Sequence, residues 1–440
     1  MSLSSSVVKA RAEDRREEWR LSALTASIYA IVGVQLPFFP LWLHSRDLGP
    51  DEIAAILSAP PLLRILTMLL ASRRADRDGR HGEFLVGFAL CAGLAYGLTG
   101  LARGFAAILA TVALVALAQG PINILADGII LSAAARRRAL NRPLLHYSFV
   151  RGWGSVSILF FLLASGPVAR ALPNAALAWL LCGVSLAAAA CAFMALRGVG
   201  VGAPAKARPL IGEIARPGLV ALTIAAAALI QASHAMVFAF GALHWKASGH
   251  DETFVSLAWS AGLVTEVGFF LLAGRWFGGE GRAATHIALG GAAAALRWLL
   301  MADDPGTVGI FVAQALHGLS CAAVQLGPAY LLARLVGAGR YSQAQAWLSA
   351  SVAAGLSLAT LACGPLQTSF GERGYLAMAA LAALGLALAL GLGRALRRAD
   401  DSGAISDGAV VAPSSIPANA APSSRRTGRF PRRHPRSAAD

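Results

Sequence analysis

The chain has 440 residues, of which 56% are hydrophobic and only 14% are charged, and its mean hydropathy is +0.60. This composition excludes a soluble globular protein and predicts a membrane protein. The net charge of +15 does not indicate nucleic-acid binding, because the basic residues fall in short loops and in the two terminal segments. A G-x-x-x-x-G-K-S/T motif does not occur, which argues against ATP hydrolysis.

Apolar segments dominate the chain, and a helix that crosses a bilayer needs about 20 apolar residues. We predict twelve such helices, in chain order at 21–43, 51–71, 84–102, 105–131, 147–170, 174–196, 218–243, 253–276, 284–302, 307–333, 343–367 and 375–394. A charged segment, 1–20, precedes them, and the longest loop, 197–217, separates the sixth from the seventh. The Ala-, Ser-, Pro- and Arg-rich tail at 397–440 cannot bury a core, so we predict that it is disordered.

An internal repeat relates the two parts of the chain. Residues 43–52, LHSRDLGPDE, return as LHWKASGHDE at 243–252, and each copy connects one apolar segment to the next. A second pair, SRRADRDGR at 72–80 and GRWFGGEGR at 274–282, follows at nearly the same offset. A duplicated set of apolar segments is typical of transporters. The sequence therefore predicts an all-α membrane protein with twelve transmembrane helices in two pseudo-symmetric six-helix halves, 21–196 and 218–396.

The loops differ in charge, which predicts the orientation in the membrane. Loops after even-numbered segments carry sixteen Arg and Lys residues, whereas loops after odd-numbered segments carry five. Because positively charged loops stay in the cytoplasm, we expect both termini there and a multi-pass protein of the cell (inner) membrane.

The loop at 72–80 resembles the signature between helices 2 and 3 of the major facilitator superfamily. An acidic residue at a helix end can pair with a facing Arg and hold one conformation, while Gly allows the tight turn. The second copy has Gly278 at the acidic position, and a plain basic loop that only fixes topology is the alternative. The predicted conformational gate consists of Asp76, Arg77, Gly79, Arg80, Gly281 and Arg282.

Six ionisable residues lie inside otherwise apolar segments, where a charge costs about 2.5–3.5 kcal/mol and therefore needs a partner or a water-filled cavity. They are Asp127, Arg151, His234, Glu266, Arg297 and His317. Arg64 lies in the second segment, and the pattern there does not fix its depth.

Depth follows from helix direction and a rise of about 1.5 Å per residue. Asp127 and Arg151 share one depth on adjacent helices, which suggests either a fixed salt bridge or a pair that contacts substrate. Glu266, Arg297 and His317 all fall in the middle zone, which suggests a charge relay or a substrate contact.

His234 stands alone on the seventh helix, and a packing role is as plausible as a ligand role. His317 and Cys321 are one turn apart, a spacing that permits a metal ion, but the sequence offers no further ligand nearby. We expect neither a metal ion nor a cofactor.

Short motifs along nearly the whole chain, to about residue 396, resemble the phenylpropionate permease branch of the major facilitator superfamily and, more distantly, lactose permease. They are YSFVRGWGS at 147–155, QASHA at 231–235, TEV at 265–267, LRW at 296–298 and LHG at 316–318.

The resemblance to lactose permease implies residue roles. In that permease a carboxylate and an Arg hold the sugar, and the matching residues of this chain are Asp127 and Arg151. The residues that the permease uses for sugar and proton coupling match Glu266, Arg297 and His317. The family's proton-carrying Glu, one turn after the His, is Ser320 in this chain. Proton coupling through that position is therefore excluded, and Glu266 or Asp127 has to serve.

The sequence thus predicts a secondary active transporter rather than an enzyme, a monomer coupled to protons, with a small organic solute as substrate. The guanidinium group of Arg binds carboxylates well, and aromatic side chains such as Trp153 can stack on a substrate ring. An aromatic carboxylate such as phenylpropionate is therefore the favoured substrate. A proton-coupled sugar or nucleoside permease and a non-transporting membrane sensor are the alternatives. The predicted substrate-binding residues are Asp127, Arg151, Trp153, His234 and Arg297, and the predicted proton-coupling residues are Glu266, His317 and Asp127.

Overall fold

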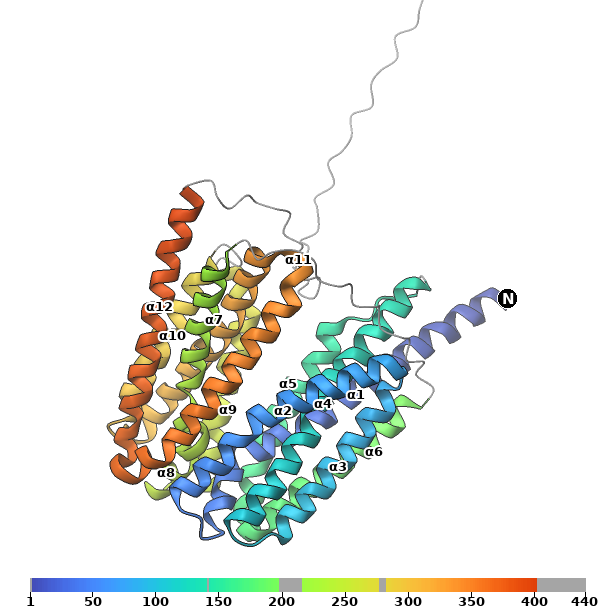
Figure 1. Cartoon of the computed structure of the whole chain (residues 1–440). Coiled ribbons are helices and arrows are strands. Elements are labelled where there is room, and N and C mark those ends of the chain that lie inside the picture. Colours follow the sequence, from blue (N-terminus) through green and yellow to red (C-terminus); the bar gives the residue numbers. More distant parts are fainter. Residues whose placement is uncertain (1, 141, 198–215, 277–281, 402–440) are drawn as a thin grey trace, which may run out of the picture. The chain divides into compact units, whose positions relative to one another are not determined.

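The computed structural model describes residues 2–140, 142–197, 216–276 and 282–401, and the regular elements among them are all helical (Figure 1). The prediction of an all-α protein is confirmed. The loop predicted at 197–217 and the predicted tail lie almost entirely outside the described residues, although the last helix continues to Asp401.

The elements before the long loop are α1 (Ser2–His44), α2 (Pro50–Asp78), α3 (His81–Leu101), α4 (Phe105–Ala139), α5 (Tyr147–Ala171), η1 (Asn174–Ala176) and α6 (Leu177–Leu196). Those after it are α7 (Pro217–Ala232), η2 (Val237–Gly241), α8 (Ala242–Ala247), α9 (Glu252–Trp276), α10 (Ala283–Met301), α11 (Gly306–Phe370), η4 (Gly371–Gly374) and α12 (Tyr375–Asp401).

The first copy of the repeat forms both ends of α2. At its start the backbone N–H of Gly49 donates to the Glu52 carboxylate at 3.0 Å, which satisfies one of the unpaired groups at a helix N-terminus. At its end Gly79 adopts a φ of 68°, and its N–H donates to the carbonyl of Ala75. A side chain rarely tolerates this left-handed conformation, so Gly79 terminates the helix.

The seventh predicted span is interrupted. Its first α-helical part, α7, ends at Ala232. The π-helix η2 follows, and α-helical geometry resumes in α8. Single-turn π-helices inside α-helices are frequent at functional sites, because they redirect side chains.

Eleven helical stretches in the described part of the chain are long and apolar enough to cross a membrane. The last of them, Gln343–Ala399, is 57 residues long and runs through the short turn η4. It contains the two spans predicted at 343–367 and 375–394. At about 20 residues per crossing it is long enough for both.

The helices before and after the long loop pack mainly among themselves. In the first set α1 packs on α5 and α6, and α4 packs on α2 and α3; in the second set α11 and α12 pack on α7 and α10. The two sets meet where α2 lies against α11 and α5 lies against α9 (Figure 1).

Two glycines mark these junctions. A Cβ at Gly364 of α11 would lie 2.8 Å from the Cα of Asp51, and one at Gly166 of α5 would lie 2.9 Å from the carbonyl oxygen of Glu252. An ion pair between Arg170 and Asp251, at 2.8 Å, closes the same region. The backbones therefore approach each other at these points more closely than any larger residue would allow.

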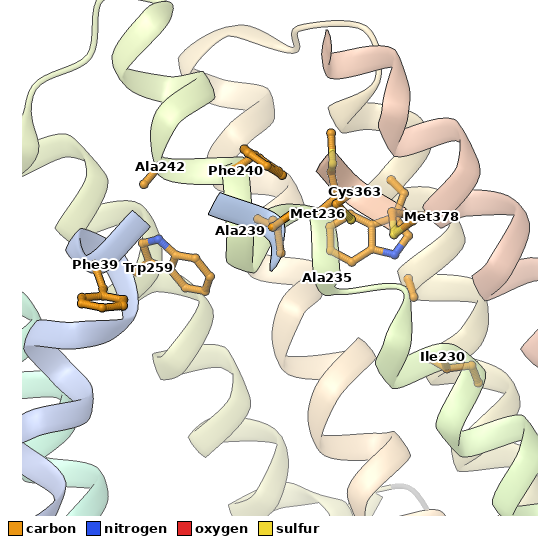
Figure 2. Packing of buried hydrophobic residues seen from close by; sticks show 14 of the residues in the cluster. Phe39, Ile230, Ala235, Met236, Ala239, Phe240, Ala242, Trp259, Cys363 and Met378 are labelled. Atoms are coloured by element: carbon orange, nitrogen blue, oxygen red, sulfur yellow. The ribbon is translucent and has the colours of Figure 1, made fainter. Parts of the chain in front are cut away.

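Apolar side chains cover the outside as well as the inside. Leu271 and Val308 are 78% and 77% exposed, as expected for residues that face lipid. The buried cluster includes Phe39, Trp259 and Phe240, which Figure 2 shows from close by.

Candidate functional site

A cavity of about 380 Å³ lies between the two helix sets, within the usual range for small-molecule sites. Residues of α1, α2, α4, η2 and α11 line it, and most of them are apolar. The polar lining residues are Gln35, Arg64, Gln119, Asn123 and Thr360.

Arg64 of α2 is the charged residue in this lining. Its Nη2 donates to the Oε1 of Gln119 at 2.6 Å, and the Nε2 of Gln119 donates to the hydroxyl of Tyr96 at 2.9 Å. The Nε of Arg64 is buried without an acceptor, and among the described residues no carboxylate lies within 4.0 Å of its guanidinium. The cavity therefore contains a positive charge that is held by neutral groups.

The close contact between α2 and α4 makes this arrangement possible. A Cβ at Gly120 would lie 2.6 Å from the carbonyl oxygen of Arg64, so only glycine lets the two helices approach here. This contact brings Gln119, the neighbour of Gly120, within reach of Arg64.

Aromatic rings form part of the apolar wall. Phe39 and Phe238 line the cavity, and they stack on Trp42 and Trp259 with ring centroids 5.6 and 5.8 Å apart. Rings fixed in this way offer flat apolar surface to a ligand at little cost in conformational entropy.

Asp127 and Arg151 lie near each other but are not directly paired. The Asp127 carboxylate accepts a hydrogen bond from the Tyr147 hydroxyl at 3.1 Å, while the Arg151 guanidinium lies over the Tyr29 ring, 4.2 Å from its centroid. Gly154 leaves room for the Arg151 guanidinium in this position, because a Cβ at Gly154 would lie 2.9 Å from Nη1 of Arg151. Neither residue of the predicted pair lines the cavity.

Trp153, also predicted to bind substrate, packs with two aromatic residues. Its ring centroid lies 5.6 Å from that of Trp19 and 6.4 Å from that of Phe149. It does not line the cavity either.

His317 lies between Arg297 and Glu266. A guanidinium can only donate, so the contact of 2.7 Å from Nη1 of Arg297 makes Nδ1 of His317 an acceptor and leaves the hydrogen on Nε2. That Nε2 is 3.9 Å from the Glu266 carboxylate, which also accepts from Gln325 at 2.9 Å. Arg297 is fully buried and also donates to Gln314. The three residues that were predicted to act together are neighbours, with the imidazole in the middle.

His234 is fully buried behind the cavity wall. Its Nδ1 is 3.1 Å from the carbonyl oxygen of Ile230, and its Nε2 is 3.1 Å from the hydroxyl of Ser320. The carbonyl can only accept, so Nδ1 carries the hydrogen. These contacts occupy both ring nitrogens.

The side chains of His234, His317 and Cys321 offer ligand atoms within 4.8 Å of one another. The donor set resembles a metal site, but the guanidinium of Arg297 occupies Nδ1 of His317. That Nδ1 is the ring nitrogen that lies 3.7 Å from Sγ of Cys321, so a metal ion between them would have to displace the bond from Arg297 and stand beside a positive charge. These residues therefore do not fit a metal ion.

The predicted gate loop is held by local contacts. Asp76 lies 2.8 Å from Nε2 of His81, and Arg80 pairs with Glu83, a hydrogen bond that raises the pKa of the Arg80 guanidinium. Arg77 is largely exposed. In the second copy Arg282 is the residue before α10, whereas Gly281 lies outside the described residues.

Sequence reasoning missed the polar group at Arg64. The signal available was a basic residue inside an apolar segment. Its hydrogen-bond partner Gln119, and Tyr96, which accepts from Gln119, are uncharged and lie on other helices. The aromatic residues that line the cavity are Phe39 and Phe238, whereas Trp153, which was expected to stack on a substrate ring, does not.

A bundle of long apolar helices in two sets, with a cavity where the sets meet, defines a membrane transporter. A sequence model described as the MFS_1 like family matches residues 18–372, so the chain belongs to this family of the major facilitator superfamily. The predictions of a transporter and of this superfamily are confirmed.

Known proteins support the same assignment. The chain is 27% identical over 289 residues to a probable 3-phenylpropionic acid transporter of Escherichia coli (strain K12), which covers 65% of this chain and 74% of that protein. Among solved structures, the nucleoside transporter NupG has a TM-score of 0.70 at 15% identity, covering 86% of this chain and 98% of that one. A POT family peptide transporter in an auto-inhibited form has a TM-score of 0.66 at 14% identity, covering 87% and 97%. These relatives are transporters and not enzymes.

Proposed function

We propose that this protein is a proton-coupled symporter for a small aromatic carboxylate such as 3-phenylpropionate. The proposal rests on Arg64, a cation that lies in a largely apolar cavity. The near neighbours of its guanidinium are neutral. A buried charge without a counter-ion is costly, and a carboxylate substrate supplies that counter-ion. Arg also offers the planar pair of donors that a carboxylate fits.

The remainder of the cavity suits the apolar part of such a substrate. Phe39 and Phe238 offer ring faces, and the volume of about 380 Å³ exceeds what one aromatic ring with a short side chain needs. The relative described as a probable 3-phenylpropionic acid transporter supports this substrate class.

The membrane arrangement belongs to the same proposal. We infer twelve crossings, with halves at 21–196 and 218–396 and both termini on the cytoplasmic side of the inner membrane. In this orientation the contacts at Gly166 and Gly364 and the Arg170–Asp251 pair lie at the external ends of the helices. The cavity is then closed on the external side, and substrate exchanges with the cytoplasm in this state.

Proton coupling is proposed to involve Glu266. Its carboxylate is bonded by the neutral amide of Gln325 and faces the Nε2–H of His317 at 3.9 Å, so no described positive group is in direct contact with it. A carboxylate in such a place can change its proton affinity when the two halves move, which couples a proton gradient to the change of state. Asp127 is the rival carrier, and one copy of the chain is proposed to suffice.

Uptake of labelled 3-phenylpropionate, a disaccharide and a nucleoside into vesicles, with and without an uncoupler, tests the proposal. We expect accumulation of 3-phenylpropionate that the uncoupler abolishes. Accumulation of the sugar or nucleoside instead contradicts the proposed substrate class, and accumulation that ignores the uncoupler contradicts proton coupling. Absence of uptake of any compound would favour a sensor.

A further inference from the structure

A second cavity, which shares no lining residue with the central one, lies between the start of α10, the middle of α11 and the last turns of α12. It has a volume of about 240 Å³ and is lined by three arginines, Arg282, Arg334 and Arg397, together with Thr285 and apolar residues. Each arginine lies at or within a few residues of the end of a candidate membrane span, at the level where bilayer and water meet.

Arg282 and Arg397 are the two arginines on which the site depends. Arg282 precedes the first residue of α10, and Arg397 lies on the last turns of α12. The Nη1 of Arg397 lies only 3.8 Å from where a Cβ of Gly393 would be, so its guanidinium folds back over the lining of the cavity. Among the described residues no ion pair within 4.0 Å joins either arginine to a carboxylate.

The start of α10 adds to the positive potential. The residues of its first turn, including Ala284 and Thr285, line the same cavity, and no side chain caps this helix end. The N–H groups of a first helical turn attract anions. Guanidinium groups beside such a turn are a strong match for a phosphate.

The other lining residues are apolar and point to a lipid rather than a soluble ion. Leu331 and Leu396 form the inner wall, and Leu390, which is 48% exposed, also lines the cavity. A free phosphate needs no such surface, whereas the glycerol and acyl chains of a phospholipid do. Basic pockets between transmembrane helices are known to hold lipid headgroups.

We propose that the cavity formed by Arg282, Arg397 and the apolar residues of α10, α11 and α12 beside them binds the headgroup of an anionic phospholipid. The site belongs to the helices after the long loop alone, so it requires only that the chain spans a membrane and not that the proposed substrate is correct. A lipid held there ties the start of α10 and the last turns of α12 to the bilayer surface.

The test is phosphatidylglycerol binding to the purified full chain in neutral detergent, measured by native mass spectrometry and by the shift in thermal stability. Each arginine near a membrane surface contributes about 1 kcal/mol, so we expect about fivefold weaker binding for Arg397→Gln and about 25-fold for Arg282→Gln with Arg397→Gln. The matched controls are Arg394→Gln and Arg398→Gln, two exposed residues of the same helix that do not line the cavity and should leave binding unchanged.

Three outcomes would overturn the proposal. Equal binding of phosphatidylcholine would show that the negative headgroup is not recognised. An equal thermal shift with inorganic phosphate alone would make the site one for soluble anions. Equal losses in the control variants would show that only the general surface charge matters. Because binding is read without any transport, failure here is distinct from failure of the proposed uptake, and elution of every variant as a single species confirms that it is folded.

Discussion

Replacing Arg64 by Gln removes the positive charge of the central cavity and keeps a polar side chain in its place. The Nη2 of Arg64 is committed to Gln119 and its Nε is buried, but no hydrogen bond to a described residue engages Nη1, so this donor remains for a substrate carboxylate. A hydrogen bond to a charged group contributes about 1.5–3 kcal/mol. We therefore expect KM for 3-phenylpropionate to rise about 10- to 150-fold in Arg64→Gln.

The assay is initial uptake of labelled 3-phenylpropionate, with unlabelled 3-phenylpropanol as a neutral competitor. The alcohol keeps the ring and loses the charge, so its inhibition constant should differ little between the wild type and Arg64→Gln. Gln119→Glu is the matched variant, because it places a carboxylate against Arg64 and should weaken binding of the acid without removing the arginine. In Gln119→Ala the charge stays available and uptake should persist.

The reasoning is refuted if Arg64→Gln transports the acid with an unchanged KM. It is also refuted if acid and alcohol lose affinity equally, since the variant would then have altered the shape of the cavity and not its charge.

Three further results are expected. Glu266→Gln should mimic the protonated state, so that exchange of substrate persists while accumulation that depends on the proton gradient is lost; if an uncoupler still abolishes accumulation in this variant, another residue carries the proton. Reporter fusions after Arg77 and after Lys246 should report opposite sides of the membrane, and the same side for both would contradict the proposed topology. Gly166→Leu should keep the two helix sets apart beside Ser256, and a cysteine probe at the external end should then react faster than in the wild type; an unchanged rate would show that the contact is not needed for closure.

The sequence predicted the helical bundle because its signals are local. A span needs only a run of apolar residues, and a buried charge is visible as an interruption of that run. For the same reason Glu266, Arg297 and His317 could be assigned to one zone of the membrane from helix direction and depth, and the structure then shows that they are neighbours.

Contacts that depend on how two helices approach could not be predicted in this way. The site at Arg64 requires the close contact at Gly120, and nothing local distinguishes that glycine from many others in the chain. The same holds for Asp127, which has the expected depth but bonds to Tyr147 while Arg151 lies over Tyr29. The depth of a residue in the membrane is only one coordinate of its side chain. Which residue it contacts also depends on the direction in which it points around the helix axis.

The polar residues of the central cavity are distributed unevenly between the two helix sets. Gln35, Arg64, Gln119 and Asn123 all belong to α1, α2 and α4, whereas η2 and α11 contribute Thr360 and otherwise apolar residues. If the sets rotate against each other as proposed, an anion bound to Arg64 moves with the first set and keeps its contact with this arginine. What changes during the transport cycle is the apolar protein surface that covers the rest of the substrate. Substrates with the same charge would then differ in turnover according to the size of their apolar part, while the charge decides only whether they bind at all.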